Sequence, residues 1–308
     1  MIIVKLIGGM GNQMFQYAYA RQLMEQYNDN ECFLDLTWFN KNRKSHEKYM
    51  LNQFNINDNI KIINTKADLR KKVPIVNRIL LIIHVFLYKI IFHVFNRKIA
   101  VNYGLYINKF LCNIGLYWYI FFYDFINLKI NNKRNNYFIG YWQSYKFFEN
   151  IHIDIKRELT PLVKNDYDNN LIKMILDKQS VALHIRRGDY LQNVNMNIFT
   201  DNYYNEAILK MNTLVDNPHY FVFSNDIDWV KQNMPFNTNN IIYVDQSKND
   251  FEDFYYMKIC KHYIMSNSTY CWWAQFLSDH DFKKVIAPKK WTENNMINDI
   301  YQSNWIII

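Results

Sequence analysis

One stretch near the middle of the chain limits the fold more than any other: residues 181–190, which read Val-Ala-Leu-His-Ile-Arg-Arg-Gly-Asp-Tyr. The apolar start is typical of a buried parallel strand, and charged residues follow it abruptly. In an open α/β sheet, ligands bind just beyond the carboxyl ends of the strands. The sequence therefore predicts a strand that ends at a binding site, with a solvated Arg-Arg-Gly-Asp turn as the alternative.

The two arginines of this stretch, Arg186 and Arg187, suit a phosphorylated ligand. A guanidinium group stays charged and presents a planar fork of donors that can meet two phosphate oxygens at once. Neighbouring side chains of a strand point to opposite faces, so the two arginines are expected to differ in their surroundings. The formal net charge of +8 also indicates an anionic partner, but it does not choose among nucleotide, nucleic acid and membrane.

The second half of the chain has the alternating pattern of an α/β domain. Polar clusters follow three expected strands, at residues 184–189, 224–228 and 266–269. In a doubly wound sheet such strand ends can converge on one crevice. Ser268 and Thr269 stand where a helix is expected to begin, so their hydroxyl and N–H groups either receive phosphate oxygens or cap the helix.

Asp226 and Asp228 have the D-x-D spacing of some metal sites. Two observations favour the metal-free alternative. Asp228 is well placed to cap a short helix, and the neighbouring arginines already offer positive charge for a diphosphate. We therefore expect no metal and no other cofactor.

A glycine-rich segment, residues 8–14, joins the first expected strand to the first expected helix. Such a turn lets backbone N–H groups approach a ligand, or it needs glycine only for its dihedral angles. The dinucleotide-binding fingerprint fails here, because Met14 occupies the third glycine position counted from Gly9 and Gly11. Dinucleotide binding is therefore not expected.

Much of the first half carries no recognisable chemistry. Basic residues from Lys66 to Arg78 lead into an apolar run at 79–95, which is 17 residues long and interrupted by charged and histidine side chains. The run falls short of a membrane span, and His84 would lie nearly opposite His93 on a helix, so it is not cleanly amphipathic. Two readings remain: a buried helical subdomain, or a surface that rests on a bilayer.

The pattern of the chain predicts two domains, residues 1–155 and 156–308, the first including the apolar and basic segment 60–130. Near their junction, Trp142 and Gln143 either line a sugar pocket or pack at the interface. The four cysteines form no C-x-x-C pair, and the chain opens directly on an expected strand. A reduced, cytoplasmic protein is expected on these grounds.

Five segments together resemble glycosyltransferase family 11, the α-1,2-fucosyltransferases, in its bacterial form. They occur in the family's order and are residues 8–18, 140–144, 184–190, 223–226 and 266–273. The H-x-R-R-x-D-Y pattern of residues 184–190 is the most specific, and α-1,6- and protein O-fucosyltransferases have a weaker form of it. The resemblance implies an α/β, GT-B-like fold of two facing Rossmann-like domains, here with a helical, apolar insertion in the N-terminal half.

The activity implied by the resemblance is inverting, metal-independent transfer of L-fucose from GDP-β-L-fucose to the 2-hydroxyl of a terminal galactose. The acceptor would be a surface glycan precursor, either a galactose-terminated oligosaccharide or a lipid-linked glycan of lipopolysaccharide type. The enzyme would work in the bacterial cytoplasm, in solution or on the inner face of the cytoplasmic membrane. No motif supports nucleic-acid binding.

The resemblance also assigns roles to single residues. The donor-binding residues would be His184, Arg186, Arg187, Asp226, Ser268, Thr269 and, from the first loop, Gly11. The catalytic residues would be Arg186, Asp189 and Asn12, with Trp142 and Gln143 on the acceptor side. The α-1,6 relatives place a glutamate after the motif, whereas no acid stands between Asp189 and Asp201 here. Asp189 is thus either the base or the group that orients an arginine.

Three alternatives remain open. The chain could be a fucosyltransferase of another linkage, a transferase of another GDP-sugar, or a non-catalytic glycan- or membrane-binding component of polysaccharide assembly.

Overall fold

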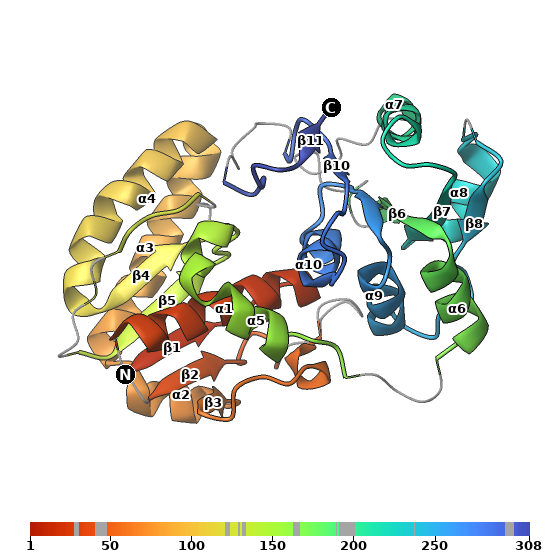
Figure 1. Cartoon of the computed structure of the whole chain (residues 1–308). Coiled ribbons are helices and arrows are strands. Elements are labelled where there is room, and N and C mark those ends of the chain that lie inside the picture. Colours follow the sequence, from red (N-terminus) through yellow and green to blue (C-terminus); the bar gives the residue numbers. More distant parts are fainter. Residues whose placement is uncertain are drawn as a thin grey trace. The chain divides into compact units, whose positions relative to one another are not determined.

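The computed structural model describes residues 1–27, 31–40, 48–120, 124–128, 130, 134–162, 167–188, 190, 201–236, 238–292 and 299–308. These fall into two compact units, Met1–Leu159 and Thr160–Ile308, each built on a parallel sheet flanked by helices (Figure 1). The predicted α/β class is therefore confirmed. The predicted boundary, between residues 155 and 156, falls inside helix α5 (His152–Glu158), and the observed division follows the end of that helix.

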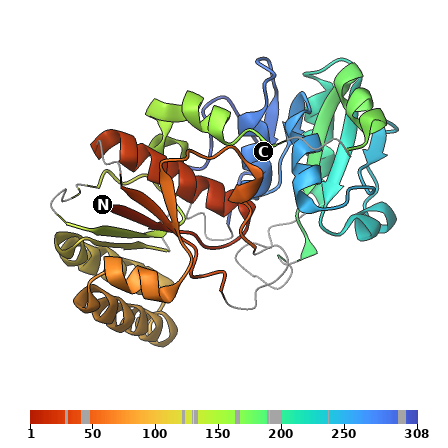
Figure 2. The same ribbon diagram turned by 90° about the horizontal axis from the view of Figure 1, so that it is seen from below.

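The first unit contains a five-stranded sheet in the order β3-β2-β1-β5-β4. Its strands are β1 (Ile2–Lys5), β2 (Cys32–Asp35), β3 (Ile60–Ile63), β4 (Leu116–Tyr119) and β5 (Asn136–Gly140). Helices α1 (Met10–Tyr27) and α5 cover one face of this sheet (Figure 2). The other face carries α2 (Lys66–Lys72), α3 (Ile75–Val94) and α4 (Arg97–Leu111). Short 3-10 turns stand at Leu51–Gln53, Cys112–Ile114, Tyr145–Phe147 and Glu149–Ile151.

Both faces of the first sheet are buried, which explains why its strands are apolar nearly throughout. On one face, Ile3, Phe33 and Ile139 pack with residues of the α3–α4 pair. On the other face, α1 buries Met14, Tyr17, Ala18 and Leu23. As predicted, the glycine-rich segment joins a strand, β1, to a helix, α1.

The second unit contains a six-stranded sheet in the order β11-β10-β9-β6-β7-β8. The strands are β6 (Gln179–Ile185), β7 (Pro218–Ser224), β8 (Ile241–Tyr243), β9 (His262–Ile264), β10 (Val285–Ala287) and β11 (Ile306–Ile307). The helices are α6 (Asn169–Asp177), α7 (Asp201–Asn212), α8 (Ile227–Asn233), α9 (Asp250–Lys258) and α10 (Thr269–Leu277).

Strand β6 is the centre of this second sheet. It pairs in parallel with β7 on one side and with β9 on the other, and its residues from Ser180 to Ile185 are buried. The chain proceeds outward from β6 through β7 to β8 and then returns to the opposite side of β6 with β9. The strand order therefore reverses at β6, and α/β proteins bind ligands at the carboxyl ends of strands where such a reversal occurs.

Candidate functional site

His184 joins the end of β6 to the segment that follows β9. Its side chain is 3% exposed, and its Nδ1 lies 2.7 Å from Ser266 Oγ. Its ring centroid lies 5.6 Å from that of Tyr270. Burial, and then the charge of Arg186, lowers the pKa of His184 to about 3, so its imidazole is neutral near pH 7. A neutral ring in this place fixes the strand end and adds no charge to the site.

Arg186 belongs to the side of the sheet that carries β9 and α10. Its guanidinium carbon lies 5.7 Å from the ring centroid of Tyr190, and its charge lowers the pKa of His184. Tyr190, in turn, donates from its hydroxyl to the backbone carbonyl of Asn267, which precedes α10. A guanidinium near the N-terminus of a helix makes a place suited to a diphosphate, because helix N-termini favour anions.

Ser268 and Thr269 begin α10 as predicted: Ser268 is the N-cap, and Thr269 is the first helical residue. Ser268 Oγ accepts from the backbone N–H of Tyr270 at 3.3 Å. The Ser268 hydroxyl therefore caps the helix, which was one of its two predicted roles. Other backbone N–H groups in the first turn of α10 have no partner within the helix.

Arg187 turns toward β7 and α8, as the alternation of a strand predicts. It forms an ion pair with Asp226, and its guanidinium carbon lies 3.7 Å from the ring centroid of Trp229. Its backbone N–H donates to Asn225 Oδ1 at 2.9 Å. Arg187 and Asp226, both expected to touch the donor, thus partner each other in this structure. Asp189, the expected base, lies outside the described residues.

The turn after β6 is also closely packed against the end of β7. A Cβ at Gly188 would stand 2.6 Å from Asn225 Nδ2, so any side chain there would displace the amide. Asp228 does not cap α8, contrary to expectation: the helix begins at Ile227, and Asp226 occupies the N-cap position without a side-chain cap bond. Among the described residues, no group of three or more His, Cys, Asp or Glu side chains gathers as metal ligands would.

One buried acid near this strand end was not predicted from the sequence. Asp253 lies on α9, and burial raises the pKa of its carboxyl to about 7. Its Oδ1 is buried without a hydrogen-bond partner among the described residues. Its charge also acts on Tyr270, the neighbour of His184. In the sequence, the one indication that Asp253 is buried was its position between Phe251 and Phe254.

In the first unit, the glycine-rich loop and the end of β5 come together. Gly8 has a φ of +81°, and a Cβ there would stand 2.6 Å from Asn12 Nδ2, so glycine is required. The Gln16 amide spans the two segments, accepting from Ile7 N at 2.9 Å and donating to Gly140 O at 3.0 Å. Gly11 lies in the first turn of α1, where backbone N–H groups lack carbonyl partners within the helix.

Two predicted residues from separate motifs, Asn12 and Gln143, meet directly. Gln143 Nε2 donates to Asn12 Oδ1 at 2.7 Å. The contact holds the first residues of α1 against the turn after β5. Asn12, a predicted catalytic residue, is thus hydrogen-bonded to Gln143, a predicted acceptor-side residue, within the first unit.

Trp142, the other acceptor-side candidate, belongs to the core of the first unit. Its side chain is 2% exposed, and its ring stacks on Tyr19 with centroids 4.1 Å apart. Its backbone has a positive φ of 55°, and a Cβ at Gly140 would stand 2.8 Å from the indole. Of the two roles expected for Trp142, the structure favours packing over lining a sugar pocket.

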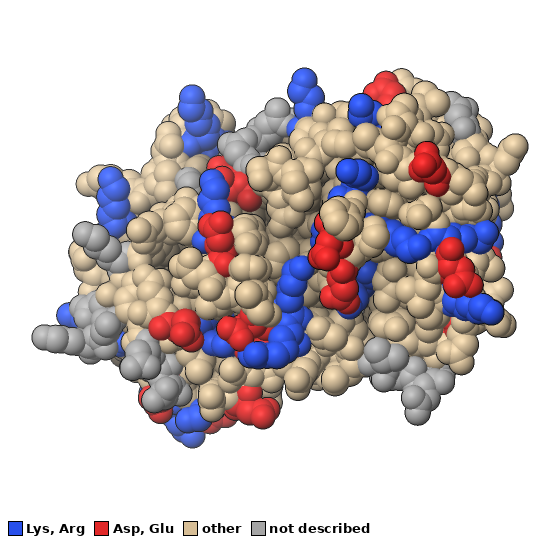
Figure 3. Space-filling model, viewed as in Figure 1, with Lys and Arg blue, Asp and Glu red and all other residues tan. Residues whose placement is uncertain are grey.

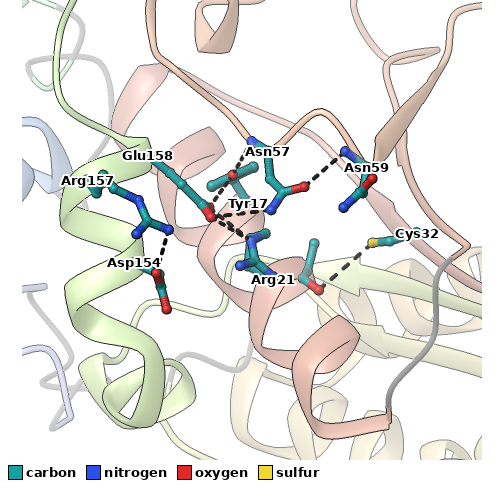
Figure 4. Close-up of polar contacts among 9 residues, drawn as sticks. Tyr17, Arg21, Cys32, Asn57, Asn59, Asp154, Arg157 and Glu158 are labelled. Atoms are coloured by element: carbon teal, nitrogen blue, oxygen red, sulfur yellow. Dashed lines mark hydrogen bonds and ion pairs between the residues drawn. The ribbon is translucent and has the colours of Figure 1, made fainter.

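A buried polar network fastens α1, which carries Asn12, to α5 (Figure 4). Glu158 accepts from the Tyr17 hydroxyl at 2.5 Å and pairs with Arg21 Nε at 2.9 Å. The Tyr17 hydroxyl also accepts from the backbone N–H of Asn57, in the segment before β3. Burial, and then Glu158, raises the pKa of Tyr17, so the phenol keeps its proton and donates it. The network was not predicted from the sequence.

Over its whole length, the chain is similar to known glycosyltransferases. The family model "Glycosyl transferase family 11" matches residues 1–308. An α-1,2-colitosyltransferase of Escherichia coli is 29% identical over 319 residues, covering 100% of this chain and 98% of that protein. The O-antigen biosynthesis glycosyltransferase WbnK of Escherichia coli is 30% identical over 317 residues, covering 98% of both. A galactoside α-(1,2)-fucosyltransferase 1 of Aotus azarae is 26% identical, covering 49% of this chain and 48% of that protein.

Among solved structures, the fold resembles that of fucosyltransferase NodZ from Bradyrhizobium. The TM-score is 0.53 at 11% identity, covering 90% of this chain and 92% of that chain. A NodZ α-1,6-fucosyltransferase crystal soaked with GDP-fucose gives a TM-score of 0.50 at 11% identity, with 90% and 91% coverage. At this identity the likeness concerns the fold, and it confirms the predicted GT-B-like class.

Proposed function

Because the chain belongs to glycosyltransferase family 11, we propose that it transfers L-fucose from GDP-β-L-fucose to the 2-hydroxyl of a terminal galactose. One observation carries the proposal most directly: Arg186 stands at the carboxyl end of β6, on the side of the segment that opens α10. A guanidinium and a helix N-terminus together suit the diphosphate of a GDP-sugar.

In the reaction, the galactose 2-hydroxyl attacks C1 of fucose from the face opposite GDP, so a β-linked donor gives an α-linked product. The C1–O bond to the diphosphate breaks, and the electron pair leaves with GDP. Negative charge grows on the leaving diphosphate, where fixed donors stabilise it more than they stabilise the ground state. Arg186 and the first N–H groups of α10 are the donors that we assign to this task.

Several other residues act by holding this arrangement. Neutral His184 ties β6 to Ser266. Arg187 and Asp226 hold the turn after β6 against the end of β7, so we assign them a positioning role beside any contact with the ribose. Asp189 stays a prediction, either as the base or as the group that orients an arginine. The base takes the proton late, because the transition state resembles an oxocarbenium ion.

On the first unit, the Asn12–Gln143 pair is the part that we assign to the acceptor side. Its amides offer donors and acceptors to sugar hydroxyls, and the Gln13 and Gln16 amides fix the loop that precedes Asn12. The acceptor that we propose is a galactose-terminated precursor of a surface polysaccharide, because a full-length relative is an O-antigen biosynthesis glycosyltransferase.

A second donor is favoured by a specific observation. A relative that covers the whole chain is an α-1,2-colitosyltransferase, which keeps the α-1,2 linkage while transferring a different sugar. GDP-colitose is therefore the donor to test against GDP-fucose.

The decisive assay measures GDP release and product linkage with each donor, in EDTA and in manganese. We expect release that requires a terminal β-galactoside, is faster with GDP-fucose and persists in EDTA. The matched control is the 2-deoxygalactoside, which lacks the attacking hydroxyl and should accept no fucose.

Each other result removes one part of the proposal. Faster release from GDP-colitose replaces the donor, and an active 2-deoxygalactoside rejects the linkage. Activity that is lost in EDTA and restored by manganese supports the alternative hypothesis of a metal site at Asp226 and Asp228. GDP binding without release, with any acceptor tried, supports a non-catalytic component.

A further inference from the structure

Helix α3 presents a continuous apolar face to the outside of the first unit. Large side chains recur along it at spacings of three and four residues, so they lie on one side of the helix. Their exposed fractions run from 41% to 69% for Ile75, Ile79, Ile82, Phe86, Ile90 and Val94. Soluble monomers seldom leave so long an apolar stripe uncovered.

By length and composition, α3 could cross a membrane: it has 20 residues, and its most apolar 18-residue window has a mean hydropathy of 2.0 and is 17% buried. It is the one such helix in the described part of the chain. The predicted apolar run starts at residue 79, whereas the helix starts one turn earlier, at Ile75 after Pro74. The stripe is therefore about 30 Å long.

The opposite side of α3 is fastened to the sheet. His84 packs against Trp118 with ring centroids 4.6 Å apart, and Tyr88 packs against the same indole at 4.9 Å. Asn77 Nδ2 donates to the carbonyl oxygen of Ile114 at 2.8 Å. A helix held in this way offers one face to its surroundings, which suits a surface that it lies on rather than a bilayer that it crosses.

The charges in the stretch of chain that contains this face are almost all positive. Between residues 61 and 112 the chain has ten Lys and Arg residues and one acidic residue, Asp68, whereas the whole chain has a net charge of +8. Arg70 lies in the last turn of α2, just before α3, and Lys89 is exposed on α3 itself. Elsewhere, acidic and basic side chains lie next to one another on the face that Figure 3 displays. An apolar stripe flanked by basic residues is complementary to anionic lipid.

We propose that the outer face of α3, with the basic residues of α2 and of the start of α4, docks on an anionic lipid surface. The helix lies in the plane of the headgroups, with its apolar stripe toward the acyl chains. This docking is separate from the transfer reaction, so its failure would leave the proposed function untouched.

Flotation with vesicles tests the docking. Wild-type protein should float with vesicles of phosphatidylglycerol and phosphatidylcholine, and weakly with phosphatidylcholine alone. Ile82→Gln/Phe86→Gln should abolish flotation. The matched control is Ile153→Gln/Phe282→Gln, which removes exposed apolar side chains from other elements and should float as the wild type does.

A second set of variants tests the charge. Arg70→Gln/Lys71→Gln/Lys89→Gln should lower the vesicle partition coefficient roughly 100-fold, at about fivefold for each basic residue. Lys173→Gln/Lys210→Gln/Lys284→Gln removes the same charge elsewhere and should lower it much less. All variants should keep the wild-type circular dichroism spectrum and transfer to a soluble galactoside.

Two outcomes would overturn the proposal. Equal loss of binding in both charge variants would show attraction by net charge alone. A wild-type dimer that Ile82→Gln/Phe86→Gln converts to monomer, without vesicle binding, would show that a second copy of the chain covers the face.

Discussion

Two neighbouring arginines have different tasks in this chain, and lysine substitutions separate them. Arg186→Lys keeps the charge and loses the fork, so we expect a fall in kcat of about 100- to 1,000-fold with a smaller change in donor KM. Arg187→Lys removes the guanidinium that pairs with Asp226 and lies over Trp229, so its main effect should be a loss of stability of about 1–2 kcal/mol.

Steady-state kinetics and thermal unfolding of both variants check this prediction. Small and equal kinetic effects would mean that the segment after β6 is a solvated basic turn and no active site.

At Asp253, the protein carries a buried carboxyl whose pKa is raised from 3.8 to about 7. The unfolded chain releases this proton near pH 4, so the folded protein holds the extra proton between about pH 4 and 7. The contribution of Asp253 to stability therefore falls as the pH rises through this window. Asp253→Asn should be more stable than the wild type at pH 8, by an amount on the order of 2–4 kcal/mol.

Melting temperatures measured from pH 4 to 8 test this, since the advantage of Asp253→Asn should vanish toward pH 4. Asp250→Asn is the comparison: Asp250 is exposed in the first turn of the same helix and raises the pKa of Asp253 less than burial does, so its variant should show only a much weaker trend of the same sign. If Asp253→Asn is no more stable than the wild type at pH 8, the assignment is contradicted.

Residues whose roles are indicated by their neighbours in the sequence could be predicted, whereas residues whose roles depend on spatial neighbours could not. Ser268 and Thr269 follow from a polar cluster at a strand end, and Gly8 from a turn between strand and helix. Asp253 and Glu158 could not be found in this way, because a buried acid is defined by what surrounds it in space. For Trp142 the sequence left a sugar pocket and packing as alternatives for the same reason, since its partner Tyr19 lies on another element.

At the scale of elements, buried parallel strands and the first helix were predicted well because their apolar runs stop at polar or glycine residues. The ends of α3 were predicted less well, since Ile75 and Val76 lie among the basic residues before the run. The domain boundary was placed inside α5 because this short helix has no strong periodic signal of its own.

The contact between α1 and α5 gives a prediction at this scale. Glu158→Gln keeps the shape of the side chain but leaves the buried Arg21 unpaired, so the first unit should lose about 3–5 kcal/mol. Asp154→Asn breaks the exposed pair with Arg157 on the same helix and should cost about 0–1 kcal/mol (Figure 4).

Urea unfolding of the two variants, followed by circular dichroism, measures the difference. The double variant Arg21→Met/Glu158→Leu should recover part of the loss, because it removes both buried charges. A Glu158→Gln variant as stable as Asp154→Asn would show that the network contributes little.

For the whole molecule, buried neutral histidines predict a loss of stability in acid. Burial lowers the pKa of His84 and His262 to about 4 and, with Arg186, that of His184 to about 3. The unfolded chain binds these protons below about pH 6.5, so the stability that the three residues contribute is present above that pH and is lost as the pH falls toward 4. Asp253 acts in the opposite direction and offsets part of the loss.

Melting temperatures should therefore drop between about pH 6.5 and 4.5, and one substitution should reduce the drop. Both ring nitrogens of His84 are buried without hydrogen-bond partners among the described residues, so His84→Phe keeps the aromatic packing and removes the site of protonation. His93→Phe, at an exposed position of the same helix, is the control. An unchanged pH profile in His84→Phe would contradict the assignment.

Each of the two units is one uninterrupted stretch of chain, and they meet between Leu159 and Thr160. A gene for such a protein needs a single crossover to exchange one unit for that of a relative. If the second unit selects the activated sugar and the first selects the glycan, one recombination event would combine an existing donor with an existing acceptor. New surface polysaccharides could then arise by exchange between genes, without stepwise change inside either sheet.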